Sequence, residues 1–234
     1  MAPALVGVGV GPGDPEHLTL EALRALREAG RVFAPSLALD VVGRAESIVR
    51  EAAPEVQVER LVITMRRDGG PDVYAEAARR IAASLQHRER VAFATLGDPN
   101  IYSTFSSLAR EVRTLCPDAA IETVAGIMAF QALAARAGFV VLEGTETLSL
   151  ITALDGPDAL DDALADPARA VAVYKGGRHL PAIAKRLADA GRLDGAFAGE
   201  LLGLPGERAG PLDELAGAPA SYLATVLVPP GTRT

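Results

Sequence analysis

The sequence has very few cysteine, histidine and aromatic residues. Its 234 residues include one cysteine, Cys116, three histidines and no tryptophan. A single cysteine cannot form an internal disulfide or a paired-cysteine metal site, so a disulfide-stabilised secreted fold is excluded. His17, His87 and His179 lie far apart and match no histidine metal motif such as HExxH, so we expect no metal centre.

Long hydrophobic runs and an excess of positive charge are also missing. No apolar stretch approaches the roughly 18–20 residues that span a bilayer, and the N-terminal segment lacks the charge and apolar length of a signal peptide. We therefore expect a cytoplasmic protein without a membrane partner. The net charge of −7 disfavours general nucleic-acid binding, which needs a basic face. With 49% hydrophobic residues, the chain can form one large core or two small ones.

Strands and helices are expected to alternate along the first half. Short apolar runs that end in glycine or proline predict strands, and apolar residues at every third or fourth position predict helices. The predicted strands are 5–10, 31–34, 56–63, 90–96 and 120–124, and the predicted helices are 19–29, 41–52, 72–86 and 101–115. This order is typical of a mostly parallel, doubly wound α/β sheet.

The second half has a different order of predicted strands and helices. Helices are predicted at 126–137, 158–165 and 180–190, and strands at 148–153, 170–174, 197–202 and 222–228. The late strands follow short loops, which favours some antiparallel pairing and hence a mixed sheet. We place a domain boundary near Ala125, between an N-terminal α/β domain of residues 1–124 and a C-terminal α/β domain of residues 125–234.

Five loops at predicted strand ends are candidates for binding. The first, GVGVGPGDP at 7–15, does not fit the dinucleotide pattern GxGxxG, because the third glycine position falls on Pro12 or Asp14. It is either a tight turn or a place where backbone approaches a ligand. No phosphate-binding GxxxxGK[ST] motif follows it.

The remaining loops leave structural and functional readings open. In GDPNIYST at 97–104, Asp98 and Pro99 suit the N-cap and first position of a helix, but that reading does not require the three hydroxyls that follow. AGIMAFQ at 125–131 and ELLGLPGE at 200–207 read as turns. YKGGRH at 174–179 carries Lys175, Arg178 and His179, either as a solvated loop or as a site for a substrate carboxylate.

Taken in order, these segments resemble the tetrapyrrole (corrin/porphyrin) methyltransferases, which use S-adenosylmethionine. The resemblance is carried by GVGVGPGDPEHLTLEAL at 7–23, GDPNIYST at 97–104, AGIMAFQALAARAG at 125–138, VAVYKGG at 171–177 and ASYLATVLVPP at 220–230. It covers nearly the whole chain. Within the family, VFAPS, LVITMRRD and YKGGRHLP are most similar to the members that methylate precorrin-2 at carbon 20 in cobalamin biosynthesis. Two departures are Ala125, where the family usually has proline, and Met128-Ala129, where it usually has a small hydroxyl pair.

The resemblance implies two α/β domains with the cofactor in a trough between them, and a homodimer. The cofactor-binding residues it implies are Pro12, Gly97, Asp98, Ile101, Tyr102, Ser103, Ile127, Met128, Tyr174, Leu202, Gly203 and Tyr222. Because precorrin-2 is a polycarboxylate, the candidate substrate contacts are Arg66, Arg67, Lys175, Arg178 and His179. Methyl transfer yields S-adenosylhomocysteine and depends on positioning, so we name no catalytic residue and no metal.

Other functions remain open at this point. A different ring carbon or a cobalt-containing substrate would fit the same family. A nucleotide-binding oxidoreductase should carry an acidic residue about 20 residues beyond the first loop; residues 31–36 offer none, although Asp40 lies a little further on. A non-catalytic ligand-binding protein could share the fold. An RNA methyltransferase is disfavoured because the sequence has no obvious basic stripe.

Overall fold

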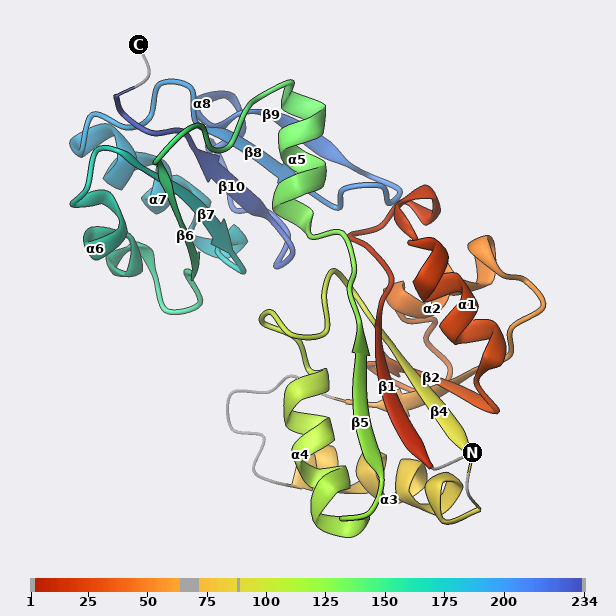
Figure 1. Cartoon of the computed structure of the whole chain (residues 1–234). Helices are drawn as coiled ribbons and strands as arrows, with labels where there is room; N and C mark the ends of the chain where they lie inside the picture. The colour runs from red at the N-terminus through yellow and green to blue at the C-terminus, as the bar shows by residue number, and fades with distance from the viewer. Residues whose placement is uncertain (1–2, 64–71, 88, 233–234) are drawn as a thin grey trace. The chain divides into compact units, whose positions relative to one another are not determined.

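The computed structural model describes residues 3–63, 72–87 and 89–232. The chain forms two compact units, Met1–Met128 and Ala129–Thr234, each with its own sheet (Figure 1). That residues 1–124 and 125–234 are separate domains, with a boundary near Ala125, stays a prediction. No helix in the described ranges has the length and apolar character needed to cross a membrane.

The sheet of the first unit is parallel, as predicted. Its strands are β1 (Ala4–Gly9), β2 (Arg31–Ser36), β3 (Val58–Val62), β4 (Arg90–Thr95) and β5 (Ala120–Val124). They lie in the order β3-β2-β4-β1-β5, and the pairings between these described strands are all parallel. The ends of β1, β4 and β5 therefore meet at one edge of the sheet, which is where open α/β sheets bind ligands.

Helices cover both faces of this sheet, which confirms the doubly wound prediction. The helices are α1 (Leu20–Glu28), α2 (Arg44–Ala52), α3 (Asp72–Gln86) and α4 (Phe105–Leu115). Alternate residues of β1 face opposite sides: Val6 and Val8 pack with α1 and α2, whereas Leu5 packs with α3 and α4. Each fully buried aliphatic side chain in these clusters stabilises the fold by roughly 1.5–3 kcal/mol.

Four predicted helix starts are too early. The helix predicted from 158 begins at Asp161, after a 3-10 turn at Pro157–Leu160. The helix predicted from residue 101 begins at Phe105, because Tyr102 has a left-handed φ of 49° that an α-helix cannot contain. The helix predicted from 41 begins at Arg44, after a loop. The helix predicted from 126 begins at Ala129, after an extended segment.

The sheet of the second unit is mixed, as predicted. Its strands are β6 (Thr147–Thr152), β7 (Arg169–Tyr174), β8 (Phe197–Glu200), β9 (Arg208–Pro211) and β10 (Thr225–Val228), in the order β6-β7-β10-β8-β9. Within this described sheet, β6 pairs with β7 in parallel, and the other pairings are antiparallel. Because β10 runs against β7 and β8, its first residue, Thr225, lies beside Tyr174 and Gly199 at their ends.

The helices of the second unit also lie on both faces of its sheet. They are α5 (Ala129–Ala137), α6 (Asp161–Leu164), α7 (Leu180–Asp189) and α8 (Leu212–Leu215). This unit also contains 3-10 turns at Pro157–Leu160 and Gly177–His179, and the first unit has one at Pro15–His17. Leu133 of α5 packs with Leu227 of β10, whereas Ile183 of α7 packs with Val226 on the other face. Neither β9 nor α8 was predicted, because GERAGPLDEL has no apolar alternation and a helix of one turn leaves no periodic signal.

Candidate functional site

Three glycines at the ends of β1, β4 and β5 of the first unit pack against one another. Gly97 donates its N–H to the carbonyl of Gly11 at 2.9 Å, which joins the loops after β4 and β1. A Cβ on Gly9 would lie 2.5 Å from the Gly97 carbonyl oxygen, and a Cβ on Gly126 would overlap that same oxygen. Glycine at positions 9 and 126 therefore lets the backbone segments approach closely, and Gly97 allows the left-handed φ of 63° at the turn after β4. We call Gly9, Gly97 and Gly126 the glycine junction.

Asp98 ties the loop after β4 to the loop after β5. Its Oδ1 accepts the N–H of Asn100 at 2.8 Å, and its Oδ2 accepts the N–H of Gly126 at 3.1 Å. The alternative reading of Asp98 as a helix N-cap is wrong, because α4 begins seven positions later at Phe105. The carboxylate instead holds the glycine junction together.

The hydroxyl of Ser103 is used within its own loop. Its Oγ lies 3.0 Å from Thr95 Oγ1 and accepts the N–H of Phe105 at 3.1 Å. Tyr102, next to it, is 45% exposed. Of the other expected cofactor residues in this unit, Pro12 and Met128 are buried and Ile101 and Ile127 are half-buried.

Backbone strain coincides with the predicted binding loops. Among the described residues, the non-glycine residues with positive φ are Tyr102, Lys175 and Leu201, at 49°, 59° and 53°. They follow β4, β7 and β8, respectively. Such conformations cost roughly 1–3 kcal/mol each and persist only where the surroundings hold them, which is common at functional sites.

In the second unit, the loop after β7 packs against the segment before β10. The carbonyl of Gly177 accepts the N–H of Ala220 at 2.8 Å, and a Cβ on Gly177 would overlap the Ser221 carbonyl. This contact places Lys175 and Tyr222 in adjoining segments. Tyr222 is 36% exposed.

The residues expected around this loop have different surroundings. The Tyr174 hydroxyl accepts the N–H of Phe130 at 3.1 Å, so it caps the start of α5. Burial lowers the pKa of the half-buried Lys175 ammonium. Arg178 is exposed and His179 is half-buried. Arg66 and Arg67, the other expected substrate contacts, lie outside the described residues.

The loop after β8 contains the remaining expected cofactor residues. Leu202 is buried, and Gly203 has a φ of 72°. Gly203 donates its N–H to Glu207 Oε2 at 2.7 Å, and Glu207 Oε1 pairs with Arg136 Nε at 2.7 Å. Arg136 and Glu207 also line an open pocket of about 450 Å³ with Phe197 and Ala209.

Glu200, at the end of β8, was not predicted to have a role. One oxygen accepts a hydrogen bond from Arg208 Nε at 2.6 Å, and the other accepts the N–H of Ser221 at 2.5 Å. Sequence reasoning missed both Glu200 and Glu207, because only folding brings Ser221 to Glu200 and Arg136 to Glu207.

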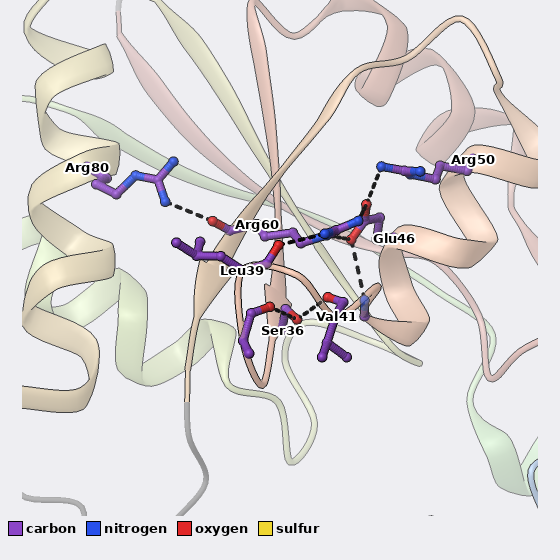
Figure 2. Close-up of polar contacts among 9 residues, drawn as sticks. Ser36, Leu39, Val41, Glu46, Arg50, Arg60 and Arg80 are labelled. Carbon is purple, nitrogen blue, oxygen red and sulfur yellow. Dashed lines mark hydrogen bonds and ion pairs between the residues drawn. The ribbon is translucent and has the colours of Figure 1, made fainter.

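A buried ion cluster holds the loop after β2, as Figure 2 shows. The fully buried Glu46 pairs with Arg60 Nε at 2.6 Å and with Arg50 at 2.6 Å. Burial by itself raises the pKa of the Glu46 carboxyl, but the hydrogen bonds from Arg60 and the charge of Arg50 outweigh it. The pKa therefore lies below its ordinary value of 4.5.

The same cluster anchors the loop's backbone. Arg60 donates to the carbonyl of Leu39 at 2.6 Å, and Ser36 Oγ lies within hydrogen-bonding distance of the Ala38 and Val41 carbonyls (Figure 2). The loop exposes apolar side chains to solvent, including Leu37 and Leu39 at 69% and 65%. Its position at the end of β2 puts it on the ligand-binding edge of the first sheet.

Comparisons with known proteins define the class. Residues 4–216 match the family model described as Tetrapyrrole (Corrin/Porphyrin) Methylases. The chain therefore belongs to the tetrapyrrole methylase family, and the resemblance predicted from the sequence motifs is confirmed. Membership makes the protein a methyltransferase and favours this activity over a nucleotide-binding oxidoreductase.

Individual relatives are similar over most of their length. The chain is 33% identical to a precorrin-2 C(20)-methyltransferase of Sinorhizobium sp, over 96% of this chain and 94% of that protein. It is 31% identical to a cobalt-precorrin-2 C(20)-methyltransferase of Salmonella typhimurium, over 87% and 86%.

Solved structures confirm the fold. A putative cobalamin synthesis related protein from Corynebacterium diphtheriae has a TM-score of 0.71 at 22% identity, over 97% of this chain and 98% of that one. A cobalt precorrin-4 methyltransferase also has a TM-score of 0.71, at 19% identity over 97% and 95%. The predicted architecture of two α/β domains, one parallel and one mixed, is that of these neighbours.

Proposed function

We propose that this protein transfers the methyl group of S-adenosylmethionine to carbon 20 of precorrin-2, in cobalamin biosynthesis. The observation that carries the proposal is the similarity to the Sinorhizobium precorrin-2 C(20)-methyltransferase, which is 33% identical over nearly the full length of both chains. The Salmonella relative is named for cobalt-precorrin-2, so a cobalt-containing substrate is the second candidate.

The strand-end loops fit a ligand that is bound by backbone groups. The glycine junction brings the backbone at the ends of β1, β4 and β5 together, and Tyr102 and Leu201 hold left-handed backbone in the loops after β4 and β8. We propose that S-adenosylmethionine is held by the residues that the family resemblance implies, from Pro12 in the first unit to Tyr222 in the second. When bound, it supplies an activated methyl group and a neutral thioether leaving group.

The chemistry asks the protein mainly for positioning. A reacting pair held at near-attack distance gains much of the barrier reduction from orientation alone, so rigid loops matter more than a reactive side chain. The bonds of Asp98, Ser103 and Tyr174 described above supply that rigidity. We assign no general base.

Substrate carboxylates need cations on a protein with a net charge of −7. We propose that Lys175, Arg178 and His179 bind them, with Arg66 and Arg67 as further candidates. Burial lowers the pKa of Lys175, and a bound carboxylate would raise it again and hold the ammonium charged.

We further propose a cytoplasmic homodimer, as the family resemblance implies. Light scattering of the purified protein would test this: a mass near twice the 24.2 kDa of one chain is expected.

The activity is tested by incubating the protein with precorrin-2 and S-adenosylmethionine that carries a labelled methyl group. Carbon NMR of the product locates the label, and label at carbon 20 is expected. Label at another carbon would indicate a different member of the family. A parallel reaction with cobalt-precorrin-2 separates the two substrates. Binding of both compounds without transfer would support the ligand-binding alternative.

A further inference from the structure

Several carboxylates in the described residues bind backbone N–H groups of the candidate cofactor loops. Asp98 accepts the N–H of Gly126 at 3.1 Å, and Glu207 accepts that of Gly203 at 2.7 Å. Glu200 accepts the N–H of Ser221 at 2.5 Å. We call Asp98, Glu200 and Glu207 the tethering carboxylates.

Both oxygens of each tethering carboxylate already bind a group of the protein. The second oxygen of Asp98 binds the N–H of Asn100, that of Glu200 binds Arg208, and that of Glu207 binds Arg136. A carboxylate whose two oxygens both bind protein groups is fixed in its orientation by those groups. Hydrogen bonds to an ionised acceptor are also about twice as strong as neutral ones, which suits a structural tie.

The tethered amides lie in the segments implicated in cofactor binding. Gly203 is itself an expected cofactor residue, Gly126 precedes Ile127, and Ser221 precedes Tyr222. The loop held by Glu207 also contains Leu201, whose left-handed φ of 53° needs support from its surroundings.

We propose that Asp98, Glu200 and Glu207 are positioning residues, which shape the cofactor site through the backbone rather than by touching the cofactor. This proposal rests on the proposed function. It revises the role that the resemblance implies for Asp98, from a cofactor contact to a tie between two loops. For Glu200 and Glu207 it assigns a role that the motifs did not suggest.

Glu207 offers a test with a matched control. Glu207→Ala and Arg136→Ala both remove the ion pair between Arg136 and Glu207, but only Glu207→Ala removes the bond to the Gly203 amide. We expect calorimetry to show the dissociation constant of S-adenosylmethionine rising about tenfold in Glu207→Ala. It should stay within about twofold in Arg136→Ala. Glu207→Gln keeps an acceptor oxygen and should restore most of the affinity.

The hydrogen bond between Glu207 and the Gly203 amide can be measured in the absence of the cofactor. Hydrogen exchange of the Gly203 amide, followed by NMR, should be slow in the wild type and in Arg136→Ala and fast in Glu207→Ala. Equal affinity in Glu207→Ala and Arg136→Ala, with exchange altered as expected, would overturn the positioning role. A wild type that binds no S-adenosylmethionine would overturn the proposed function itself, while the exchange data would still report the tie.

A second test, at Asp98, applies if the Glu207 variants do not fold. In Asp98→Ser, the shorter hydroxyl can still accept the Asn100 N–H two residues away but cannot reach Gly126. Asp166→Ala is its control, because Asp166 makes the same local bond, to Ala168 at 3.0 Å, in a turn away from the candidate loops. A tenfold loss of affinity is expected in Asp98→Ser alone, and an equal change in both variants would contradict the proposal.

Discussion

The space around Gly9 and Gly126 explains why these two positions need glycine. At Gly9 and Gly126 any side chain meets the backbone of a neighbouring loop, whereas at Gly217 a Cβ would meet nothing within 4 Å. The glycine-rich first loop therefore reflects the packing of three strand ends. This explains why it departs from the dinucleotide pattern, in which glycines make room for a pyrophosphate.

Gly126→Ala should disturb this junction. The new methyl group overlaps the Gly97 carbonyl, and backbone cannot give way as a flexible side chain would. We expect a loss of roughly 1–3 kcal/mol in the free energy of unfolding, measured by urea denaturation, and weaker binding of S-adenosylmethionine. Gly217→Ala is the control and should change stability little. Equal stability of the two variants would show that the junction can relax.

At the scale of elements, the loop after β2 depends on the helix and strand that flank it. Glu46 comes from α2 and Arg60 from β3, and together they hold the backbone of the loop between β2 and α2 (Figure 2). Removing one partner of a buried ion pair leaves the other uncompensated, which is more damaging than losing an exposed pair.

Glu46→Gln should therefore be strongly destabilising. We expect a loss of roughly 3 kcal/mol, at the lower end for a broken buried pair, because Arg50 and Arg60 can still reach water. Glu55→Gln, which breaks the exposed pair with Arg27, is the control and should unfold almost as the wild type does. Chemical denaturation of both variants compares their stabilities. Similar unfolding midpoints for Glu46→Gln and Glu55→Gln would contradict the structural role of the buried ion cluster.

The same carboxylate makes stability depend on pH. Because the folded-state pKa of Glu46 is lowered, its contribution is present above its ordinary value of 4.5 and is lost as the pH falls through the lower, folded value. The stability difference between the wild type and Glu46→Gln should thus be largest near neutral pH and shrink below pH 4.5. Urea midpoints measured from pH 7 downward would show this. A difference that does not change with pH would mean that Glu46 is not the titrating group.

At the scale of the whole molecule, the net negative charge means that an anionic substrate needs cationic side chains at its binding site. A polycarboxylate substrate is repelled at long range by a net charge of −7, but bonds between a cation and a carboxylate act at short range and contribute about 1.5–3 kcal/mol each. Arg178 is exposed in the 3-10 turn at Gly177–His179, whereas Lys175 is half-buried.

Arg178→Ala should raise the Michaelis constant for the tetrapyrrole substrate by about tenfold, since 1.4 kcal/mol corresponds to that factor. The affinity for S-adenosylmethionine should hardly change. Lys185→Ala removes an equal charge from the exposed side of α7, where it pairs with Asp189, and serves as the control. Steady-state kinetics of each variant would measure the Michaelis constant. An unchanged Michaelis constant in Arg178→Ala would mean that other groups bind the substrate carboxylates.

Local patterns in the sequence determined much of the architecture. Helix α3 at Asp72–Gln86 and strand β5 at Ala120–Val124 have the predicted bounds. Apolar periodicity, proline and glycine act within a few residues and therefore appear directly in the sequence. The alternation of strands and helices predicted the doubly wound sheet, and the ordered motifs predicted the family.

Only the tertiary structure decided which residues hold the loops. The start of α4 depends on the left-handed Tyr102, and the bond from Gly126 to Asp98 joins residues 28 positions apart. The bond from Ser221 to Glu200 spans 21 positions, and Arg60 reaches Glu46 across 14. No local propensity encodes such contacts, because they form only when the strand order β3-β2-β4-β1-β5 in the first unit, and the antiparallel pairing of β10 in the second, bring distant segments of the same unit together.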